Sequence, residues 1–306
     1  MRFLLTGATG YIGSAVMEAG LRAGHQVTAL VRDPEKAEHV SSRGATAVLG
    51  ELSRPTSYAA VAEQCDVLIH TASEHSKRRQ LVDRQAIDTL MAAAERRTHA
   101  GLPACVIYTS GVWVLGHTQG AAREDAPINP PAHVSWRPSH EALVLDGSQN
   151  GKVRTAVIRP AIVYGGARGI IGDLLKDARN GLVRVVGDGR NHWPCIYDRD
   201  LADAYVRVAA TPDASGIFHV NDEADERVDD IVDAISRHVR TRIEIRHVPL
   251  EEARTKMGTY ADVLALDQIV RSPRARALGW SPTLHSVAGN VARLLEEFRT
   301  KCEAAA

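Results

Sequence analysis

Three glycines near the start of the chain have the spacing of a phosphate-binding turn. Gly7, Gly10 and Gly13 lie in "RFLLTGATGYIGSAVMEAGLRAG", between a short apolar run and an amphipathic stretch. In a strand-to-helix turn the first glycine permits the tight turn, the second lets the backbone approach a pyrophosphate, and the third lets the helix pack on the strand. The N-terminus of the helix then faces the phosphates. The spacing therefore predicts a dinucleotide-binding loop.

The end of the next apolar run, "HQVTALV", indicates which dinucleotide binds. A carboxylate at this place would hold the ribose 2′-hydroxyl of NAD. The aligned residue is Val31, and the next is Arg32, whose guanidinium suits the 2′-phosphate of NADP. We therefore expect NADP(H), while Asp33 keeps NAD(H) as an alternative.

The elements that must position this loop alternate short apolar runs with longer amphipathic stretches. That alternation is typical of a parallel sheet with crossover helices. It predicts an α/β fold with a doubly wound parallel sheet in residues 1–165, completed by about 193–225, and a smaller α/β substrate lobe formed mainly by 166–306. The predicted strands are residues 2–5, 26–31, 46–49, 66–70, 104–110, 154–159 and 217–220.

Composition argues against several classes of protein. Lys plus Arg and Asp plus Glu both number 37, so no net field attracts nucleic acid or an anionic membrane. The widely spaced Cys65, Cys105, Cys195 and Cys302 indicate neither a metal site nor a disulfide framework. The first apolar run is too short for a signal peptide, and no 18-residue apolar stretch occurs. We expect a cytoplasmic protein with a small-molecule substrate.

Motifs along nearly the whole chain resemble the extended short-chain dehydrogenase/reductase family, in its NAD-dependent epimerase/dehydratase group. They occur in the family's order: "TGATGYIG", "DVLIHTAS", "CVIYTSGVWVLG", "EDAPI", "VIRPAIVYGG", "IYDRDLADAYVRVA" and "ALGWSPT". The resemblance implies a Rossmann-type sheet. It also assigns cofactor contacts: Tyr11 and Ile12 at the pyrophosphate, Glu51 and Leu52 near the adenine, and Thr71, Ala72, Ser73, Pro160, Ile162 and Val163 around the nicotinamide.

The catalytic residues that the resemblance implies are only partly present. In that family a Ser or Thr polarises the substrate oxygen, a Tyr donates its proton, and a Lys lowers the pKa of the Tyr. Ser110, or in second place Thr109, takes the first role. Trp136 and His140 stand where the Tyr and Lys are expected. An indole N–H is too weakly acidic to be the proton donor.

His140 has three possible roles. Residues four apart share a helix face, so Trp136 and His140 should lie on the same side of a helix over residues 135–148. His140 could donate a proton near neutral pH, bind the cofactor ribose, or pack structurally. Tyr164 and Tyr108, at predicted strand ends, are substitute donors, although Tyr164 belongs to the family's ordinary pattern.

Three tryptophans favour an apolar or aromatic substrate. Trp113, Trp136 and Trp193 lie on segments that should border the substrate crevice. The leading interpretation is an NADPH-dependent reductase of a small carbonyl, imine or iminium, or conjugated C=C compound. A sugar-nucleotide epimerase or dehydratase would need more polar groups and a lysine.

A catalytically silent NADP-binding sensor is the alternative, because both the Tyr and the Lys are missing. The helices over 79–97 and 135–148 correspond to those that pair subunits in many relatives. The resemblance therefore also suggests a homodimer.

Overall fold

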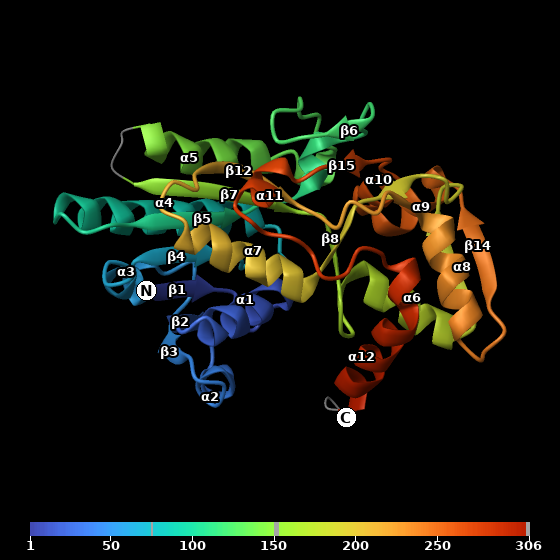
Figure 1. Ribbon diagram of the computed structural model, residues 1–306, viewed down its shortest axis with the longest axis horizontal. Coiled ribbons are helices and arrows are strands. Elements are labelled where there is room, and N and C mark those ends of the chain that lie inside the picture. The colour runs from blue at the N-terminus through green and yellow to red at the C-terminus, as the bar shows by residue number, and fades with distance from the viewer. Residues whose placement is uncertain (75, 150–152, 304–306) are drawn as a thin grey trace.

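The fold is seen in a computed structural model that describes residues 1–74, 76–149 and 153–303. Its centre is a seven-stranded parallel sheet in the order β3-β2-β1-β4-β5-β7-β12 (Figure 1). The strands are β1 (Arg2–Thr6), β2 (Gln26–Val31), β3 (Thr46–Leu49), β4 (Val67–His70), β5 (Cys105–Thr109), β7 (Arg154–Pro160) and β12 (Gly216–Val220). The predicted doubly wound α/β fold is confirmed, and each predicted strand is present with ends shifted by at most one residue.

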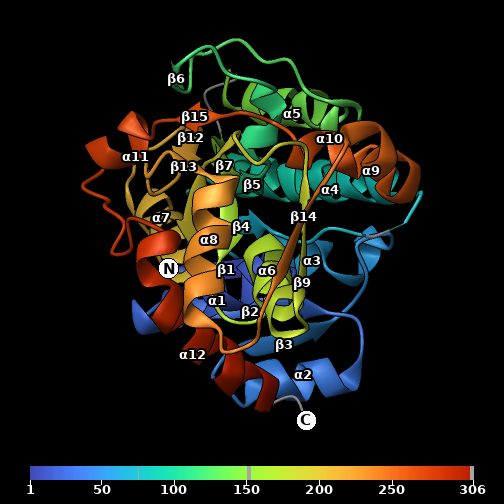
Figure 2. The same cartoon turned by 90° about the vertical axis from the view of Figure 1, so that its right-hand side faces the viewer.

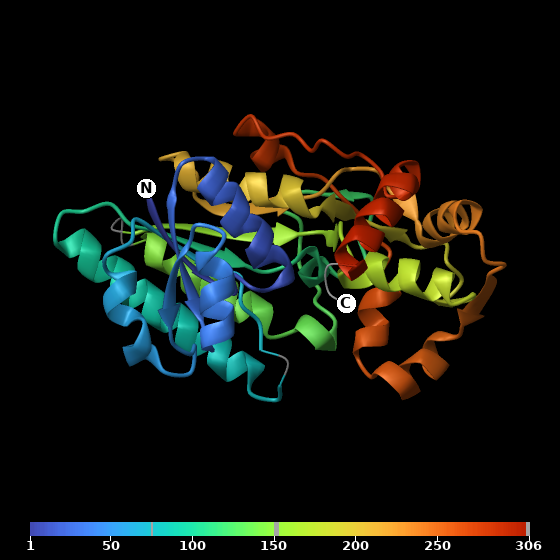
Figure 3. The ribbon, with the colours of Figure 1, turned by 90° about the horizontal axis from the view of Figure 1, so that it is seen from below.

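Helices cover both faces of the sheet because its strands are apolar on both sides; all four residues of β4, for example, are buried. The core on one face contains α1 (Tyr11–Arg22), α2 (Pro34–Ser41) and α7 (Asp198–Ala210). The core on the other contains α3 (Ala59–Ala62), α4 (Arg79–His99) and α5 (Arg137–Gln149). Figure 3 shows the two helical layers on opposite sides of the strands.

A smaller lobe with its own hydrophobic core lies beyond the carboxyl ends of the strands (Figures 1 and 2). Its elements are α6 (Gly169–Arg179), β9 (Leu182–Val186), α8 (Val228–His238), β14 (Glu244–Val248), α9 (Leu250–Met257), α10 (Tyr260–Leu264) and α12 (Val291–Glu303). Strands β9 and β14 pair in parallel. In a doubly wound sheet, ligands bind at this carboxyl edge, so the lobe overhangs the expected site.

Short elements complete the chain and join its two parts. They are the paired strands β8 (Ile162–Tyr164) and β11 (Cys195–Tyr197), β10 (His192–Trp193) and β13 (Glu226–Arg227), β6 (Ala121–Ala122) and β15 (Ile269–Val270), with helix α11 (Pro273–Ala277) and the 3-10 helices η1 (Pro55–Ser57), η2 (Val112–Leu115), η3 (Ala132–Val134) and η4 (Ala288–Asn290). No helix in the described part of the chain is both long and apolar enough to cross a bilayer.

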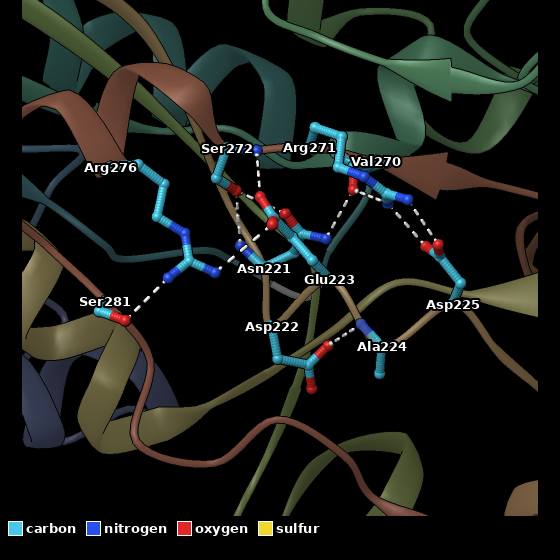
Figure 4. A network of polar contacts seen from close by, with 10 residues as sticks. All are labelled: Asn221, Asp222, Glu223, Ala224, Asp225, Val270, Arg271, Ser272, Arg276 and Ser281. Carbon is cyan, nitrogen blue, oxygen red and sulfur yellow. Dashed lines mark hydrogen bonds and ion pairs between the residues drawn. The ribbon is translucent and has the colours of Figure 1, made fainter.

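Charged groups anchor the segment that leads from β12 into the lobe (Figure 4). Glu223 and Asp225 have positive φ values of 64° and 53°, which cost energy in residues other than glycine. Glu223 accepts a hydrogen bond from the backbone of Ser272 at 2.9 Å, and Asp225 binds Arg271 through both oxygens at 2.8 and 2.6 Å. These contacts fix the path of the chain between the sheet and the lobe.

Candidate functional site

The glycine loop between β1 and α1 is packed so closely that two of its glycines leave no room for a side chain. Gly7 has a φ of +78°, and a Cβ there would lie 2.7 Å from the backbone nitrogen of Ala72. A Cβ on Gly13 would lie 2.0 Å from the carbonyl oxygen of Gly7. The Oγ1 of Thr71 donates to the carbonyl oxygen of Thr6 at 2.7 Å, which ties the loop to the end of β4.

A pocket of about 680 Å³ extends from this loop along the carboxyl ends of β1, β2 and β4. Most of the predicted cofactor residues line it: Gly7, Gly10, Tyr11, Ile12, Arg32, Glu51, Leu52, Thr71, Ala72, Ser73 and Val163. Gly13 does not line this pocket but packs against the backbone of Gly7 in the loop. Pro160 and Ile162 line a neighbouring pocket, which is described next. The close-packed glycine loop and the position of the pocket at the carboxyl ends of the strands fit a dinucleotide.

The end of β2 brings two cations to this pocket. Arg32 lines it, and so does Lys36, which was not identified from the sequence. Asp33 is engaged with α2 instead: its Oδ1 accepts a hydrogen bond from the Lys36 backbone at 2.9 Å, capping that helix. Lys36 lies in the first turn of α2, four residues after Arg32, and this spacing could have pointed to a second cation.

A second pocket, here called the crevice, has a volume of about 560 Å³ and shares Tyr11, Ile12, Ser73 and Val163 with the cofactor pocket. Its other walls come from the ends of β5 and β7, from η2 and η3, and from the first turns of α4, α5 and α6. Trp113 and Trp136 both line it. A ligand in the crevice would therefore adjoin one end of a bound dinucleotide.

Ser110 lies at the crevice wall, and its Oγ is buried without a hydrogen-bond partner in the described part of the chain. Its backbone nitrogen donates to the carbonyl oxygen of Ile158 at 2.8 Å, which fixes its position beside β7. The alternative residue, Thr109, does not line the crevice, and its Oγ1 is 2.6 Å from the hydroxyl of Tyr205. Of the two hydroxyls, that of Ser110 is the one free to bind a ligand.

Trp136 also lines the crevice, and its buried Nε1 has no hydrogen-bond partner among the described residues. The ring of His140 packs edge-on against it, with the centroids 4.8 Å apart. His140 itself is buried, does not line the crevice, and places its Nδ1 2.7 Å from the Oδ2 of Asp83. His140 therefore packs against the indole of Trp136 and can hold that ring in place. A role for His140 as proton donor or ribose ligand remains a prediction.

Asp83, which sequence reasoning missed, is the centre of a buried polar network. Besides His140, its carboxylate accepts a hydrogen bond from the hydroxyl of Tyr108 at 2.8 Å and lies 3.3 Å from Nε2 of His70. The Nδ1 of His70 is 2.6 Å from Oγ1 of Thr6, so the network reaches from the glycine loop to the crevice wall. Burial raises the pKa of Asp83, but the bonds from His140 and His70 and the charge of Arg137 outweigh burial and hold that pKa below its ordinary value.

Replacing Asp83 with Asn should lower the free energy of unfolding by about 2–4 kcal/mol, because a buried network loses its charged acceptor. The pKa of Asp83 is lower in the folded state, so its stabilisation is complete above about pH 4, the ordinary range of an Asp, and is lost as the pH falls through the folded value. Urea unfolding of both proteins between pH 3 and pH 7 measures this. Asp88→Asn is the control, since Asp88 pairs with Arg84 on the exposed side of the same helix. Equal losses in the two variants would contradict the prediction.

Two predicted site residues lie away from the crevice. Tyr164 is fully buried in the core of the lobe, against Tyr197, because β8 leaves the main sheet to pair with β11. Trp193 donates from Nε1 to the carbonyl oxygen of Leu264 at 3.0 Å and lines a separate lobe cavity of about 470 Å³. That cavity shares Ile170, Asp173 and Tyr260 with the crevice, so Trp193 can contact only a ligand that extends into the lobe.

Two arginines at the crevice were also missed. Arg79 begins α4, Arg137 begins α5, and both line the crevice beside Trp136. The two arginines are close because α4 packs against α5. No local sequence pattern predicts that Arg79 lies at the crevice, whereas Arg137 could have been identified because it follows Trp136 in the sequence. Within the described ranges, no group of three or more His, Cys, Asp or Glu side chains is arranged to hold a metal ion.

Comparison with known proteins places these features in a family. Residues 3–221 match the model of the NAD dependent epimerase/dehydratase family. The chain is 30% identical over 289 residues to an uncharacterised protein of Schizosaccharomyces pombe, covering 92% of this chain and 95% of the relative. It is 24% identical over 268 residues to the 4-hydroxy-2-methyl-3-oxo-4-farnesyl-3,4-dihydroquinoline-1-oxide ketoreductase of Stigmatella aurantiaca, covering 83% and 78%.

Among solved structures, the fold is similar to that of human epimerase family protein SDR39U1 with NADPH, at a TM-score of 0.79 and 20% identity over 97% of this chain and 99% of that one. UDP-glucose 4-epimerases are also among the similar proteins. The comparisons therefore agree on the fold and include both reductases and epimerases.

Proposed function

Because this chain belongs to the NAD dependent epimerase/dehydratase family of NAD(P)-dependent oxidoreductases and epimerases, we propose that it is an NADPH-dependent reductase. Its substrate is a small apolar or aromatic compound with a reducible carbonyl, imine or iminium, or conjugated C=C bond. The reduced nicotinamide, when bound, supplies the hydride. The protein supplies binding and orientation.

One observation carries the proposal: two residues that line a crevice adjoining the cofactor pocket each hold a buried hydrogen-bond donor that has no partner among the described residues. They are the Oγ of Ser110 and the Nε1 of Trp136. A buried donor without a partner is costly, and a ligand acceptor atom would remove that cost. An oxygen or nitrogen of the substrate that accepts from these donors would be polarised towards hydride addition.

Three candidate proton donors, Tyr108, Tyr164 and Trp136, are unavailable, which narrows the choice of reducible bond. The hydroxyl of Tyr108 is committed to Asp83, Tyr164 lies in the lobe core, and the indole of Trp136 does not release its proton. A charged C=N bond needs a hydride but no simultaneous proton. An iminium would therefore need no proton donor, whereas a carbonyl or neutral imine, whose oxygen or nitrogen can accept from Ser110 and Trp136, would take its proton from water.

The test is the consumption of NADPH, followed at 340 nm, across a panel of aromatic ketones, cyclic imines and enones, with product identified by mass spectrometry. We expect turnover of at least one class. A protein that binds NADPH tightly but turns over no member of the panel would instead support a silent sensor. Isomerisation of a sugar nucleotide without net NADPH consumption would favour an epimerase.

We further propose that NADP(H) binds more tightly than NAD(H), because Arg32 and Lys36 line the pocket where the 2′-phosphate would lie. Arg32→Ala should weaken NADPH binding about tenfold, because a charge-assisted contact with the 2′-phosphate is lost. It should leave NADH binding nearly unchanged, because NADH has no 2′-phosphate. Fluorescence titration of both cofactors measures this. Arg43→Ala, an exposed arginine that does not line the pocket, is the control. Equal or tighter NADH binding by the unaltered protein would overturn the assignment.

Helices α4 and α5 pack side by side on one face of the sheet. They correspond to the two helices that pair subunits in many relatives. We propose a homodimer formed through them. Light scattering should then give a mass near twice 33.1 kDa. A mass near that of one chain at micromolar concentration would rule the dimer out.

A further inference from the structure

We propose that the substrate carries a carboxylate, which the crevice binds between Arg79 and Arg137. The two guanidiniums lie at the same tryptophan: the Cζ of Arg137 is 4.6 Å and that of Arg79 is 5.8 Å from the ring centroid of Trp136. All three side chains line the crevice. This inference rests on the proposed function, since it names the substrate class of the same site.

Neither arginine has a carboxylate partner among the described residues. Nη2 of Arg79 donates to the carbonyl oxygen of His133 at 2.8 Å, and Nη1 of Arg137 donates to the hydroxyl of Tyr108 and the carbonyl oxygen of Thr109 at 3.1 and 2.9 Å. These neutral acceptors use one nitrogen of each fork. The remaining N–H groups are available to an anion.

Arg159, by contrast, is an arginine whose charge is paired with a carboxylate inside the protein. Arg159 is buried beside α5, where its Nε donates to Glu141 at 3.0 Å and its charge is paired within the protein. The charge of Arg137 acts on the carboxylate of Asp83, which already accepts from His140 and Tyr108. The positive charge at the crevice wall is therefore only partly balanced by the protein.

The pKa of the neighbouring His133 is affected by these two positive charges. Burial lowers its pKa, and the charges of Arg79 and Arg137 lower it further. Asp173 is the only acidic residue among those described at the crevice, and it also lines the lobe cavity. The crevice is thus cationic at the α4 and α5 end, which would attract an anion.

A carboxylate suits this geometry better than a larger anion. Its two planar oxygens match the paired N–H groups of a guanidinium, and the apolar side chains of Trp113 and Ile170, which also line the crevice, suit an aromatic or conjugated body. The substrate class is an apolar or aromatic carboxylic acid with a reducible group beside Ser110.

The experiment compares binding of 2-naphthoate and 2-naphthamide, nearly isosteric probes, to protein saturated with NADP⁺, by isothermal titration calorimetry. The naphthoate should bind at least about tenfold more tightly. Arg79→Met should reduce that difference and leave the amide unaffected. Arg78→Met, an exposed neighbour that does not line the crevice, should change neither affinity. Because Arg137 also holds Tyr108 and Thr109, it is tested as Arg137→Lys, with thermal unfolding to confirm the fold.

The outcomes separate this inference from the proposed function. Equal affinity for acid and amide in the unaltered protein, or an equal loss of both in Arg79→Met, would overturn the carboxylate site even if reductase activity were found. Arg79-dependent binding of the acid would support the site even if no NADPH were consumed. Tighter binding of 2-naphthylphosphonate than of 2-naphthoate, lost in Arg79→Met, would overturn the carboxylate assignment and favour a phosphoryl ligand.

Discussion

Replacing Gly13 with alanine should weaken NADPH binding by roughly 100-fold or more. A Cβ at this position would lie 2.0 Å from the carbonyl oxygen of Gly7 and 2.7 Å from Oγ1 of Thr71. The first neighbour is backbone, so it cannot move aside as a side chain can. The glycine loop must shift away from α1, and the backbone that faces the pyrophosphate shifts with it. Fluorescence titration with NADPH measures the affinity.

The control is Gly24→Ala, which separates loop geometry from the general cost of replacing a glycine. Gly24 has a φ of +77°, and nothing lies within 4 Å of a Cβ built there. Alanine at this turn should cost about 1 kcal/mol of folding free energy and leave NADPH affinity unchanged. Normal NADPH binding by Gly13→Ala would mean that this loop does not hold the dinucleotide.

The residues that meet at the glycine-loop pocket could be predicted because their sequence signals are local. The spacing of Gly7, Gly10 and Gly13 determines a turn within seven residues, and Arg32 follows its strand directly. Strands such as β2 are recognised by a short run of apolar residues with clear ends. Each of these inferences needs only a few neighbouring residues.

The crevice was less predictable because its groups come together through packing. Asp83 lies within a helix whose sequence gives no sign that a carboxylate is buried against Tyr108 and His140. Four-residue spacing correctly predicted that Trp136 and His140 are neighbours, but not that His140 lies behind the indole. Tyr164 was expected at the crevice because it ends the apolar run in "RPAIVYGG", whereas pairing of β8 with β11 carries it into the lobe. Each difference depends on contacts between residues far apart in sequence.

Removing the hydroxyl of Ser110 should reduce kcat/KM about 100- to 1000-fold, the range for a donor that stabilises developing charge on a substrate atom. The same change should not destabilise the fold, because the buried Oγ of Ser110 has no hydrogen-bond partner in the described residues. Loss of an unpartnered polar atom from a buried site is neutral or slightly stabilising. Ser110→Ala should therefore separate activity from stability.

Thr109→Val is the matched variant. It removes a neighbouring hydroxyl that, unlike the hydroxyl of Ser110, has a hydrogen-bond partner and belongs to a residue that does not line the crevice. Oγ1 of Thr109 is 2.6 Å from the buried hydroxyl of Tyr205, so its loss should lower the free energy of unfolding by about 1–2 kcal/mol. Thr109 does not line the crevice, so turnover by the folded fraction should be nearly unchanged. Steady-state kinetics on the substrate found in the NADPH panel, together with thermal unfolding, measures both effects. Full activity in Ser110→Ala, or a loss of activity confined to Thr109→Val, would move the polarising role away from Ser110. The buried indole N–H of Trp136, which has no partner among the described residues, would then be the next donor to test.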